Sequence, residues 1–157
     1  MFLYETFPPQ LIKVALEAED KDEVFEELVD LFCRVHNSRA REDILGALRD
    51  REAKMSTGIQ KGIALPHGKS NALEGVYGIL GISRKGIDYD ALDGQPVYLL
   101  FMLLAPDAES EKHLRLLKRL AGLLENPQFY TELVAQNEAL GANRIIRKYE
   151  DIFLASE

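Results

Sequence analysis

The 157-residue sequence has a single cysteine, Cys33, and only 19 basic side chains against 26 acidic ones. A lone cysteine excludes a disulfide within the chain and is typical of a reducing compartment, so we expect a cytoplasmic protein. Cys33 lies in a helical pattern and is interpreted as a small buried hydrophobe rather than as a nucleophile. The formal net charge of −7 argues against nucleic-acid binding, which requires many cations to neutralise phosphates.

Long apolar stretches are also missing. No segment approaches the roughly 18 apolar residues of a membrane-spanning helix, so direct membrane insertion is not expected. The N-terminus has no basic segment followed by an apolar one, so no signal peptide is predicted. A chain of this length is typically one domain, and we expect a single domain over residues 1–157.

Several motifs that define common sites are absent. The sequence has no Gly-x-x-x-x-Gly-Lys-Ser/Thr loop for nucleotide phosphates and no Gly-x-Gly-x-x-Gly. No pair of cysteines or histidines has zinc-ligand spacing, and the absence of Gly-x-Ser-x-Gly weakens a serine hydrolase interpretation. We therefore expect neither a cofactor nor a metal.

Alternating strand and helix patterns run through the chain and indicate the α/β class. Asp20 is predicted to cap a first helix that ends near His36, and Ser38 to cap a second that ends near Lys54. Other predicted elements are strands at 11–16, 76–82, 88–90 and 97–104, a turn or short helix at 68–73, a turn at 84–86, and helices starting at 110, 127 and 142. The run at 97–104 is the most apolar and is typical of a central strand buried on both faces.

The stretch at residues 56–68, Ser-Thr-Gly-Ile-Gln-Lys-Gly-Ile-Ala-Leu-Pro-His-Gly, is the most informative part of the sequence. Its apolar residues predict a short buried strand that ends at Pro66, because proline cannot donate to a sheet ladder. Gly68 is predicted to let the backbone turn away from the ring of His67. The pattern thus indicates a histidine held at a strand end, where open α/β sheets commonly place their sites.

Two further side chains could join His67. Arg51 comes shortly before the stretch, and His113 comes after the 97–104 run, where it could equally be a histidine packed beside the core. Residues 51–120 carry eight acidic and ten basic side chains, so the middle of the chain could hold an anion. A histidine in such a place can be a general base, a metal ligand or a phosphoryl acceptor. An arginine, glycine N–H groups and hydroxyls suit a phosphoryl group, although they also occur in ordinary loops.

The order of these motifs resembles the fructose/mannitol-type enzyme IIA domain of the bacterial phosphoenolpyruvate-dependent phosphotransferase system. The resemblance rests on Arg51, the Ser-Thr-Gly-Ile run, the Gly-Ile-Ala-Leu-Pro-His block and His113, and it covers nearly the whole chain. The family that the sequence resembles includes nitrogen-type regulatory proteins. The resemblance implies a single α/β domain with a mixed sheet packed between helices. It also implies a phosphotransferase in which His67 accepts the phosphoryl group, Arg51 and His113 support transfer, and Ser56 and Thr57 flank the phosphate.

The resemblance further implies the histidine-phosphorylated carrier HPr, or its nitrogen-type counterpart, as the donor. The sequence contains no IIB or membrane IIC segment, which suggests a detached carrier with two open roles. One is regulation through phosphorylation state, and the other is transport, passing the group to a separate IIB for fructose, mannitol or a related sugar. A non-catalytic binding module is a third and weaker alternative. One departure from the family is Gln60, which stands where a glycine is frequent and could narrow the pocket or alter docking.

Overall fold

The apolar run predicted as a central strand forms β6 (Val97–Ala105), and the rest of the sheet assembles around it. The computed structural model describes all residues, 1–157. Five more strands join β6: β1 (Ile12–Lys13), β2 (Gly58–Gln60), β3 (Ile63–Ala64), β4 (His67–Lys69) and β5 (Tyr77–Ile87). The helices are α1 (Leu3–Thr6), α2 (Lys21–His36), α3 (Arg41–Lys54), α4 (Ser110–Leu124), α5 (Pro127–Val134) and α6 (Ala139–Ala155), with short 3₁₀ helices η1 (Pro9–Leu11) and η2 (Asp107–Glu109).

The sheet is mixed, as the family resemblance implied. Its order is β1-β5-β6-β3-β2, and β4 also pairs with β6. β5 and β6 are antiparallel, whereas β3 and β4 both run parallel to β6, and β1 runs parallel to β5. β6 is therefore bonded along both edges, and all of its residues except Tyr98 are buried.

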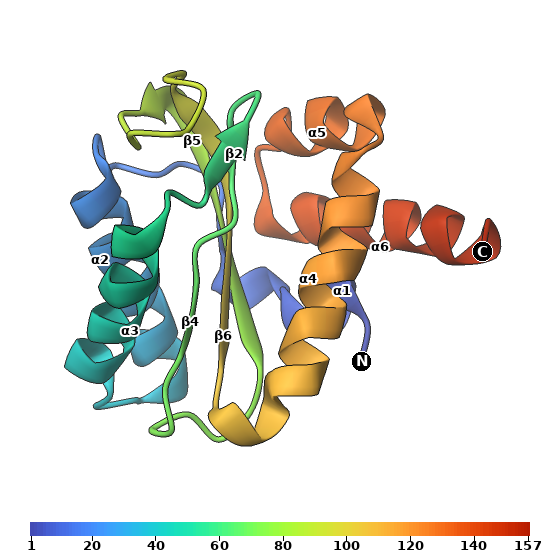
Figure 1. Cartoon of the computed structure of the whole chain (residues 1–157). Helices are drawn as coiled ribbons and strands as arrows, with labels where there is room; N and C mark the ends of the chain where they lie inside the picture. The colour runs from blue at the N-terminus through green and yellow to red at the C-terminus, as the bar shows by residue number, and fades with distance from the viewer.

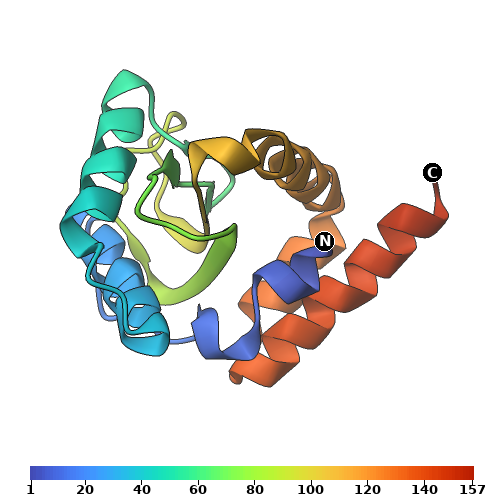
Figure 2. The same ribbon diagram turned by 90° about the horizontal axis from the view of Figure 1, so that it is seen from below.

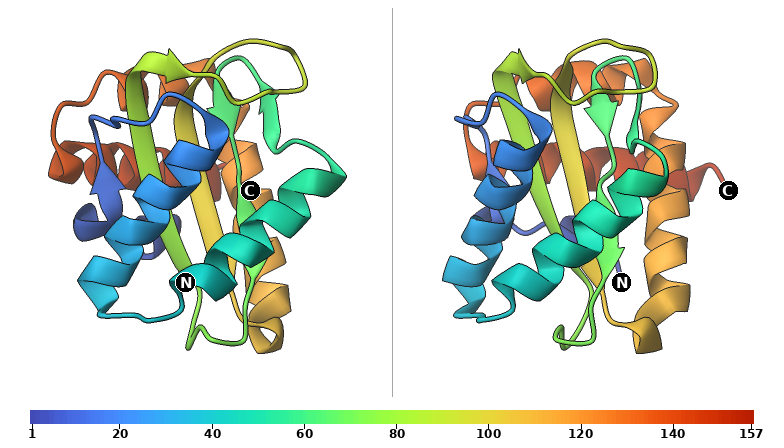
Figure 3. Two further views of the ribbon diagram at one scale, coloured as in Figure 1. Left: turned by 90° about the vertical axis from the view of Figure 1, so that its left-hand side faces the viewer. Right: turned by 60° about the vertical axis from the view of Figure 1, so that its left-hand side comes forward.

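Helices cover both faces of the sheet (Figures 1 and 2). α2 and α3 pack on one face over a core cluster of 19 buried residues, and Figure 3 shows this pair from its own side. α1, α4, α5 and α6 pack on the opposite face over a cluster of 18. No helix has both the length and the apolar character needed to cross a membrane.

Glycines in β5 and β4 allow close packing of the layers. A Cβ at Gly78 would lie 2.6 Å from the ring of Phe7, and one at Gly81 would lie 2.8 Å from Leu16, which confirms the close approach inferred for this strand. A Cβ at Gly68 would lie 3.2 Å from the backbone of Ala47 in α3. The role predicted for Gly68 was wrong: it continues strand β4 and gives room for helix α3 rather than turning the chain away.

The strand before His67, β3, ends at Ala64, just before Pro66, but pairing with β6 resumes at His67. β3 pairs Ala64 with Leu100 of β6, and β4 pairs His67 with Leu103, so both segments keep the same register. Pro66 has no N–H to donate, but its carbonyl still accepts a hydrogen bond from the Leu103 N–H at 3.0 Å. Pro66 therefore removes one N–H donor from the sheet, but the sheet continues after it, and His67 lies in strand β4.

Other predicted boundaries also differ. Ser38 does not cap α3, because its hydroxyl accepts from Ala40 N–H in the preceding turn and Ala40 is the N-cap. Residues 84–86 are a bulged part of β5 rather than a turn, and the expected strand at 88–90 is a single bridge between Asp88 and Asp20. Of the turn or short helix expected at 68–73, residues 68–69 belong to strand β4, and a turn is confined to residues 71–72. Asp20 does cap α2, and α3 ends at Lys54, as predicted.

The N-terminal helix α1 was not predicted. Its first amides donate to the fully buried carboxylate of Glu150 in α6, from Leu3 N–H at 2.6 Å and Tyr4 N–H at 3.2 Å. Arg119 of α4 also binds this carboxylate at 3.2 Å. A contact across 147 residues leaves no local pattern in the sequence, which explains the omission.

Candidate functional site

His67 begins strand β4 and is half-buried at the edge of the sheet. Its Nδ1 lies 2.8 Å from the backbone carbonyl oxygen of Leu65. A carbonyl can only accept, so Nδ1 carries the proton and donates. In the neutral ring Nε2 is then left with a free lone pair, and it accepts a hydrogen bond from Arg51 Nε at 3.2 Å. The backbone thus selects which ring nitrogen is available for chemistry.

Arg51 reaches His67 from helix α3. The close packing of Ala47 on Gly68 brings α3 against β4, and Arg51 follows Ala47 by one helical turn on the same face. Its Nη1 donates to the carbonyl of Met55 at 2.7 Å, which fixes the guanidinium while Nε points at the ring of His67.

His113 lies in the first turn of α4, with its ring centroid 5.7 Å from that of His67 and the two rings nearly perpendicular, at 82°. Its side chain is buried, with 2% of the residue exposed, yet neither ring nitrogen has a hydrogen-bond partner. Burial and the neighbouring His67 and Lys69 lower the pKa of His113 to about 4, so the ring is neutral at pH 7. Buried polar groups without partners are uncommon, and this one is placed to meet a group bound beside His67.

The three side chains meet in an open cleft of about 440 Å³ between α3, β4 and the start of α4. Its lining residues are Ala47, Asp50, Arg51, Lys54, His67, Gly68, Lys69 and His113. Three of these are cations and one is an acid, so the cleft favours an anion. Burial, together with the charge of Arg51, lowers the pKa of His67, which keeps its ring neutral and nucleophilic.

The two predicted hydroxyl residues do not line this cleft. The hydroxyl of Ser56 accepts from Gly58 N–H at 3.1 Å. Thr57 is buried, its hydroxyl donates to the Glu52 carboxylate at 2.5 Å, and it also bonds Tyr89 at 2.7 Å. In this structure both hydroxyls brace the loop after α3, and a contact with phosphate remains a prediction for them.

Glu52, which follows Arg51 in α3, joins several segments below the cleft. It accepts from Thr57 N–H at 2.8 Å and forms an ion pair with Lys21 at 3.2 Å. Burial acts to raise the pKa of Glu52, but hydrogen bonds from Thr57 and Lys21 lower it below its ordinary value, so the group is ionised. This carboxylate holds the segment whose Met55 carbonyl anchors Arg51.

Gln60 lies at the tip of the β2–β3 hairpin, away from the cleft. It is exposed and lines a separate groove of about 500 Å³ against the α4–α5 junction, with Leu124 and Tyr130 among its neighbours. Gln60 therefore does not narrow the space beside His67, and any effect on docking would act at this second groove.

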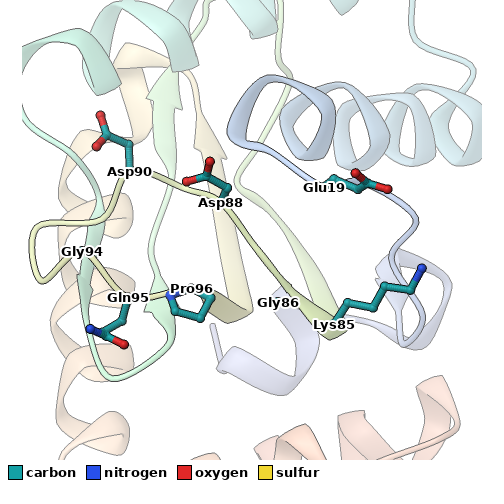
Figure 4. Close-up of a pocket in the computed structure, with 8 residues that line it drawn as sticks. All are labelled: Glu19, Lys85, Gly86, Asp88, Asp90, Gly94, Gln95 and Pro96. Carbon is teal, nitrogen blue, oxygen red and sulfur yellow. The ribbon is translucent and has the colours of Figure 1, made fainter.

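A larger concavity than this cleft, of about 640 Å³, lies elsewhere (Figure 4). Three carboxylates line it, from Glu19, Asp88 and Asp90, and Lys85 is its only cation. It contains no histidine, and its acidic lining would repel a phosphoryl group. No group of three or more histidine, cysteine or acidic residues is arranged to hold a metal.

Sequence reasoning missed two residues of the site, Lys69 and Glu52. Lys69 follows His67 by two positions in a strand, and the period of two places both side chains on one face. That signal was lost because residues 67–69 were expected to leave the sheet. Glu52 could not be recognised, because its partners Thr57, Tyr89 and Lys21 come from other segments.

Comparison with known proteins identifies the family of the chain. Residues 5–149 match the family described as phosphoenolpyruvate-dependent sugar phosphotransferase system, EIIA 2. A nitrogen regulatory protein of Bradyrhizobium diazoefficiens is 34% identical over 83% of this chain and 85% of its own length. A fructose-specific EIIA component of Haloferax volcanii is 37% identical over 73% of this chain and 74% of its own length. The fructose-specific EIIABC component of Bacillus subtilis is 34% identical over 85% of this chain, which spans only 21% of that longer protein.

Solved structures share the fold. The nitrogen regulatory protein IIA-Ntr from Neisseria meningitidis superposes with a TM-score of 0.84 at 31% identity, covering 92% of this chain and 98% of that one. IIA mannitol from Escherichia coli has a TM-score of 0.74 at 17% identity, covering 89% of this chain and 98% of that one, which shows the fold alone. The family match and these relatives show that the chain belongs to the EIIA 2 family of the phosphoenolpyruvate-dependent phosphotransferase system, whose members are phosphotransferase components that carry a phosphohistidine intermediate.

Proposed function

We propose that Nε2 of His67 accepts a phosphoryl group from HPr, or from its nitrogen-type counterpart, and passes it to a downstream protein. One observation carries the proposal. The Leu65 carbonyl holds the proton of His67 on Nδ1, which leaves the Nε2 lone pair free in a cationic cleft. A neutral imidazole with a fixed tautomer is the form that attacks phosphorus.

In the forward step the Nε2 lone pair of His67 forms a bond to phosphorus while the bond from phosphorus to the donor histidine breaks. The electron pair of the broken bond returns to the donor ring. The Nδ1 proton stays in its hydrogen bond to Leu65, so no base is required. In onward transfer an acceptor nucleophile attacks phosphorus, the Nε2–P bond breaks, and the electron pair returns to Nε2.

Arg51 and His113 are proposed to stabilise the transferring group. Arg51 Nε, which donates to Nε2 in the free protein, would move to a phosphoryl oxygen when Nε2 forms its new bond, while Nη1 keeps its anchor at Met55. His113 is buried and unpartnered beside the ring, so it gains a hydrogen bond only when the phosphoryl group is present. Hydrogen bonds that Arg51 and His113 form only with the phosphoryl group favour its transfer, because they do not stabilise the unphosphorylated protein.

Residues 1–157 are proposed to act as one EIIA unit. The family match covers residues 5–149, and the segments outside it belong to α1 and α6. The buried carboxylate of Glu150 ties these two helices together. A cytoplasmic location is proposed from the lone cysteine and from the phosphocarrier role.

For the output we propose regulation through phosphorylation state. A phosphoryl group adds nearly two negative charges to a cleft that holds Arg51, Lys54 and Lys69 against Asp50. A protein that docks over the cleft would then discriminate strongly between the two states. The likeness to nitrogen regulatory proteins along most of their length supports this output. The alternative is transport through a IIB partner, which the fructose-specific relative supports.

The proposal is tested by incubating the protein with phosphoenolpyruvate, enzyme I and HPr. Mass spectrometry should show one acid-labile phosphoryl group on the wild-type protein and none on His67→Ala. A group that attaches to His113 or His36 in that variant would overturn the assignment. Pull-downs with unphosphorylated and phosphorylated bait, beside transfer assays against each IIB, then separate the two outputs. Rapid transfer to one IIB with no state-dependent partner would establish transport.

A further inference from the structure

Lys69 lines the cleft, yet its side chain forms no hydrogen bond with His67 or Arg51 in this structure. Its Nζ donates to the hydroxyl of Ser110 at 2.8 Å, and no carboxylate pairs with it. Its charge is therefore compensated only by a neutral hydroxyl and solvent. Such a cation gains more by meeting an anion than one already held in an ion pair.

The position of Lys69 suits a group bound to His67. The two residues are separated by one position in β4, so their side chains leave the same face of the strand, about 6.6 Å apart along it. Ser110, which holds the ammonium, precedes His113 by three residues and shares its helix face. Lys69 therefore extends from the strand of His67 toward the helix of His113, and it lines the same cleft as the two histidines.

A phosphoryl group on Nε2 brings nearly two negative charges into this space. Arg51 supplies one positive charge, and its Nη1 is already committed to the Met55 carbonyl. His113 is neutral, so it contributes a hydrogen bond but no charge. One negative charge thus remains for Lys54 or Lys69, and of these two Lys69 shares the strand of His67.

We infer that Lys69 leaves Ser110 and binds the phosphoryl group carried by His67, so that it acts with Arg51 as a second cation of the transfer site. The inference rests on the proposed function and adds a catalytic residue to it. Ser110 then binds the ammonium only in the unphosphorylated protein, because on phosphorylation Lys69 exchanges the neutral Ser110 hydroxyl for the doubly charged phosphoryl group.

The test compares four variants with the wild-type protein. Lys69→Met removes the charge and keeps the length of the side chain, and Lys69→Arg keeps the charge. Ser110→Ala removes the hydroxyl that holds the Lys69 ammonium, together with the hydrogen bond from that hydroxyl to the Asp107 carbonyl. Lys118→Met is the control, because Lys118 is an exposed lysine of α4 that lies outside the cleft and forms no ion pair or hydrogen bond. Phosphorylation by HPr is timed for each, and the phosphoryl group of each phosphoprotein is titrated by ³¹P NMR.

Lys69→Met is expected to slow phosphorylation by about 10- to 100-fold, the effect of losing one charge-assisted contact. Its ³¹P titration midpoint should move to higher pH, because a lost cation makes the phosphoryl group easier to protonate. Lys69→Arg should restore most of the phosphorylation rate, and its ³¹P titration midpoint should lie close to that of the wild type. Lys118→Met should stay within about threefold of the wild type, since solvent screens an exposed charge outside the cleft.

Ser110→Ala separates direct contact from a structural role. If Lys69 binds the phosphoryl group, this variant should match or slightly exceed the wild-type rate. A rate as low as that of Lys69→Met would show that the lysine merely ties β4 to α4, and the inference would fail. It also fails if Lys69→Met transfers at the wild-type rate with an unchanged midpoint. Absence of phosphorylation in the wild type would instead refute the proposed function.

Discussion

Glu52→Gln is expected to destabilise the protein strongly, although the exchange alters a single atom of the side chain. The carboxylate accepts from Thr57 N–H at 2.8 Å, the Thr57 hydroxyl at 2.5 Å and Tyr89 at 3.3 Å, and it pairs with Lys21 at 3.2 Å. A glutamine has one oxygen that can accept and one NH₂ group that cannot. An NH₂ group at the Oε2 position would face the Thr57 N–H and the Lys21 ammonium, whereas one at the Oε1 position would require the two hydroxyls to accept instead of donate; in either case the ion pair with Lys21 is lost.

The magnitude follows from this count. A hydrogen bond to a charged group contributes about 1.5–3 kcal/mol and a neutral one about half as much. Loss of one charged contact on Glu52, with the remaining ones weakened, gives about 3 kcal/mol. For a domain of this length that corresponds to a fall in Tm of roughly 6–12 °C. The effect is well above the ±0.5 kcal/mol typical of surface substitutions.

Urea unfolding at pH 7 measures the difference, and Glu74→Gln is the control because Glu74 is exposed and forms no ion pair. The pH dependence gives a second check. The folded pKa of Glu52 is depressed below its ordinary value of 4.5, so its stabilisation is present above that pH and is lost as the pH falls through the folded pKa. The gap between wild type and Glu52→Gln should therefore be full at pH 7 and shrink below about 4.5. A loss under about 1 kcal/mol, or a gap independent of pH, would refute the reasoning.

Three further predictions concern the site and the opposite layer. Burial and the charge of Arg51 lower the pKa of His67 below its ordinary value of 6.5. Initial phosphorylation rates should therefore stay level as the pH falls to 6.5 and decrease only below it. A pH–rate profile with its midpoint above pH 6.5 would contradict this prediction. Glu150→Gln should lower the free energy of unfolding in urea by about 3 kcal/mol, because Arg119 and the amides of α1 lose a buried carboxylate. Protection of the Leu3 and Tyr4 amides from hydrogen exchange should decrease as well. Unchanged protection would show that Glu150 does not hold α1 against α6. Gly78→Ala should cost about 1–3 kcal/mol by thermal unfolding, because its Cβ would lie 2.6 Å from the Phe7 ring; a wild-type Tm would show that the ring can move freely.

Much of the architecture was readable from local pattern. The eight apolar residues at 97–104 indicated the central strand, and it is β6, buried on both faces. Asp20 with Glu23 indicated the start of α2, where Asp20 Oδ1 accepts from Glu23 N–H at 2.9 Å. These signals are local, because a helix cap and a buried strand need only neighbouring residues to be recognised.

The boundaries that failed depended on partners distant in sequence. Pro66 is a strand breaker by local rules, yet β6 carries the pairing across it into β4. Ser38 is a good cap by residue type, but its hydroxyl turns to Ala40 in the loop before α3. A local preference is worth about 1 kcal/mol, and pairing with a buried strand outweighs it.

The candidate site divides in the same way. The sequence by itself determined the chemical inventory, because it contains Arg51, His67 and His113, the groups that we propose to carry and stabilise the phosphoryl group, and the order of its motifs indicated the family that the comparisons show. Only the tertiary structure decided how they act. The Leu65 carbonyl selects Nε2 as the free nitrogen, Gly68 lets α3 bring Arg51 to it, and the start of α4 buries His113 beside it. Residue types follow from the chain, whereas a tautomer, a pKa and a distance depend on atoms that folding brings together from three separate elements.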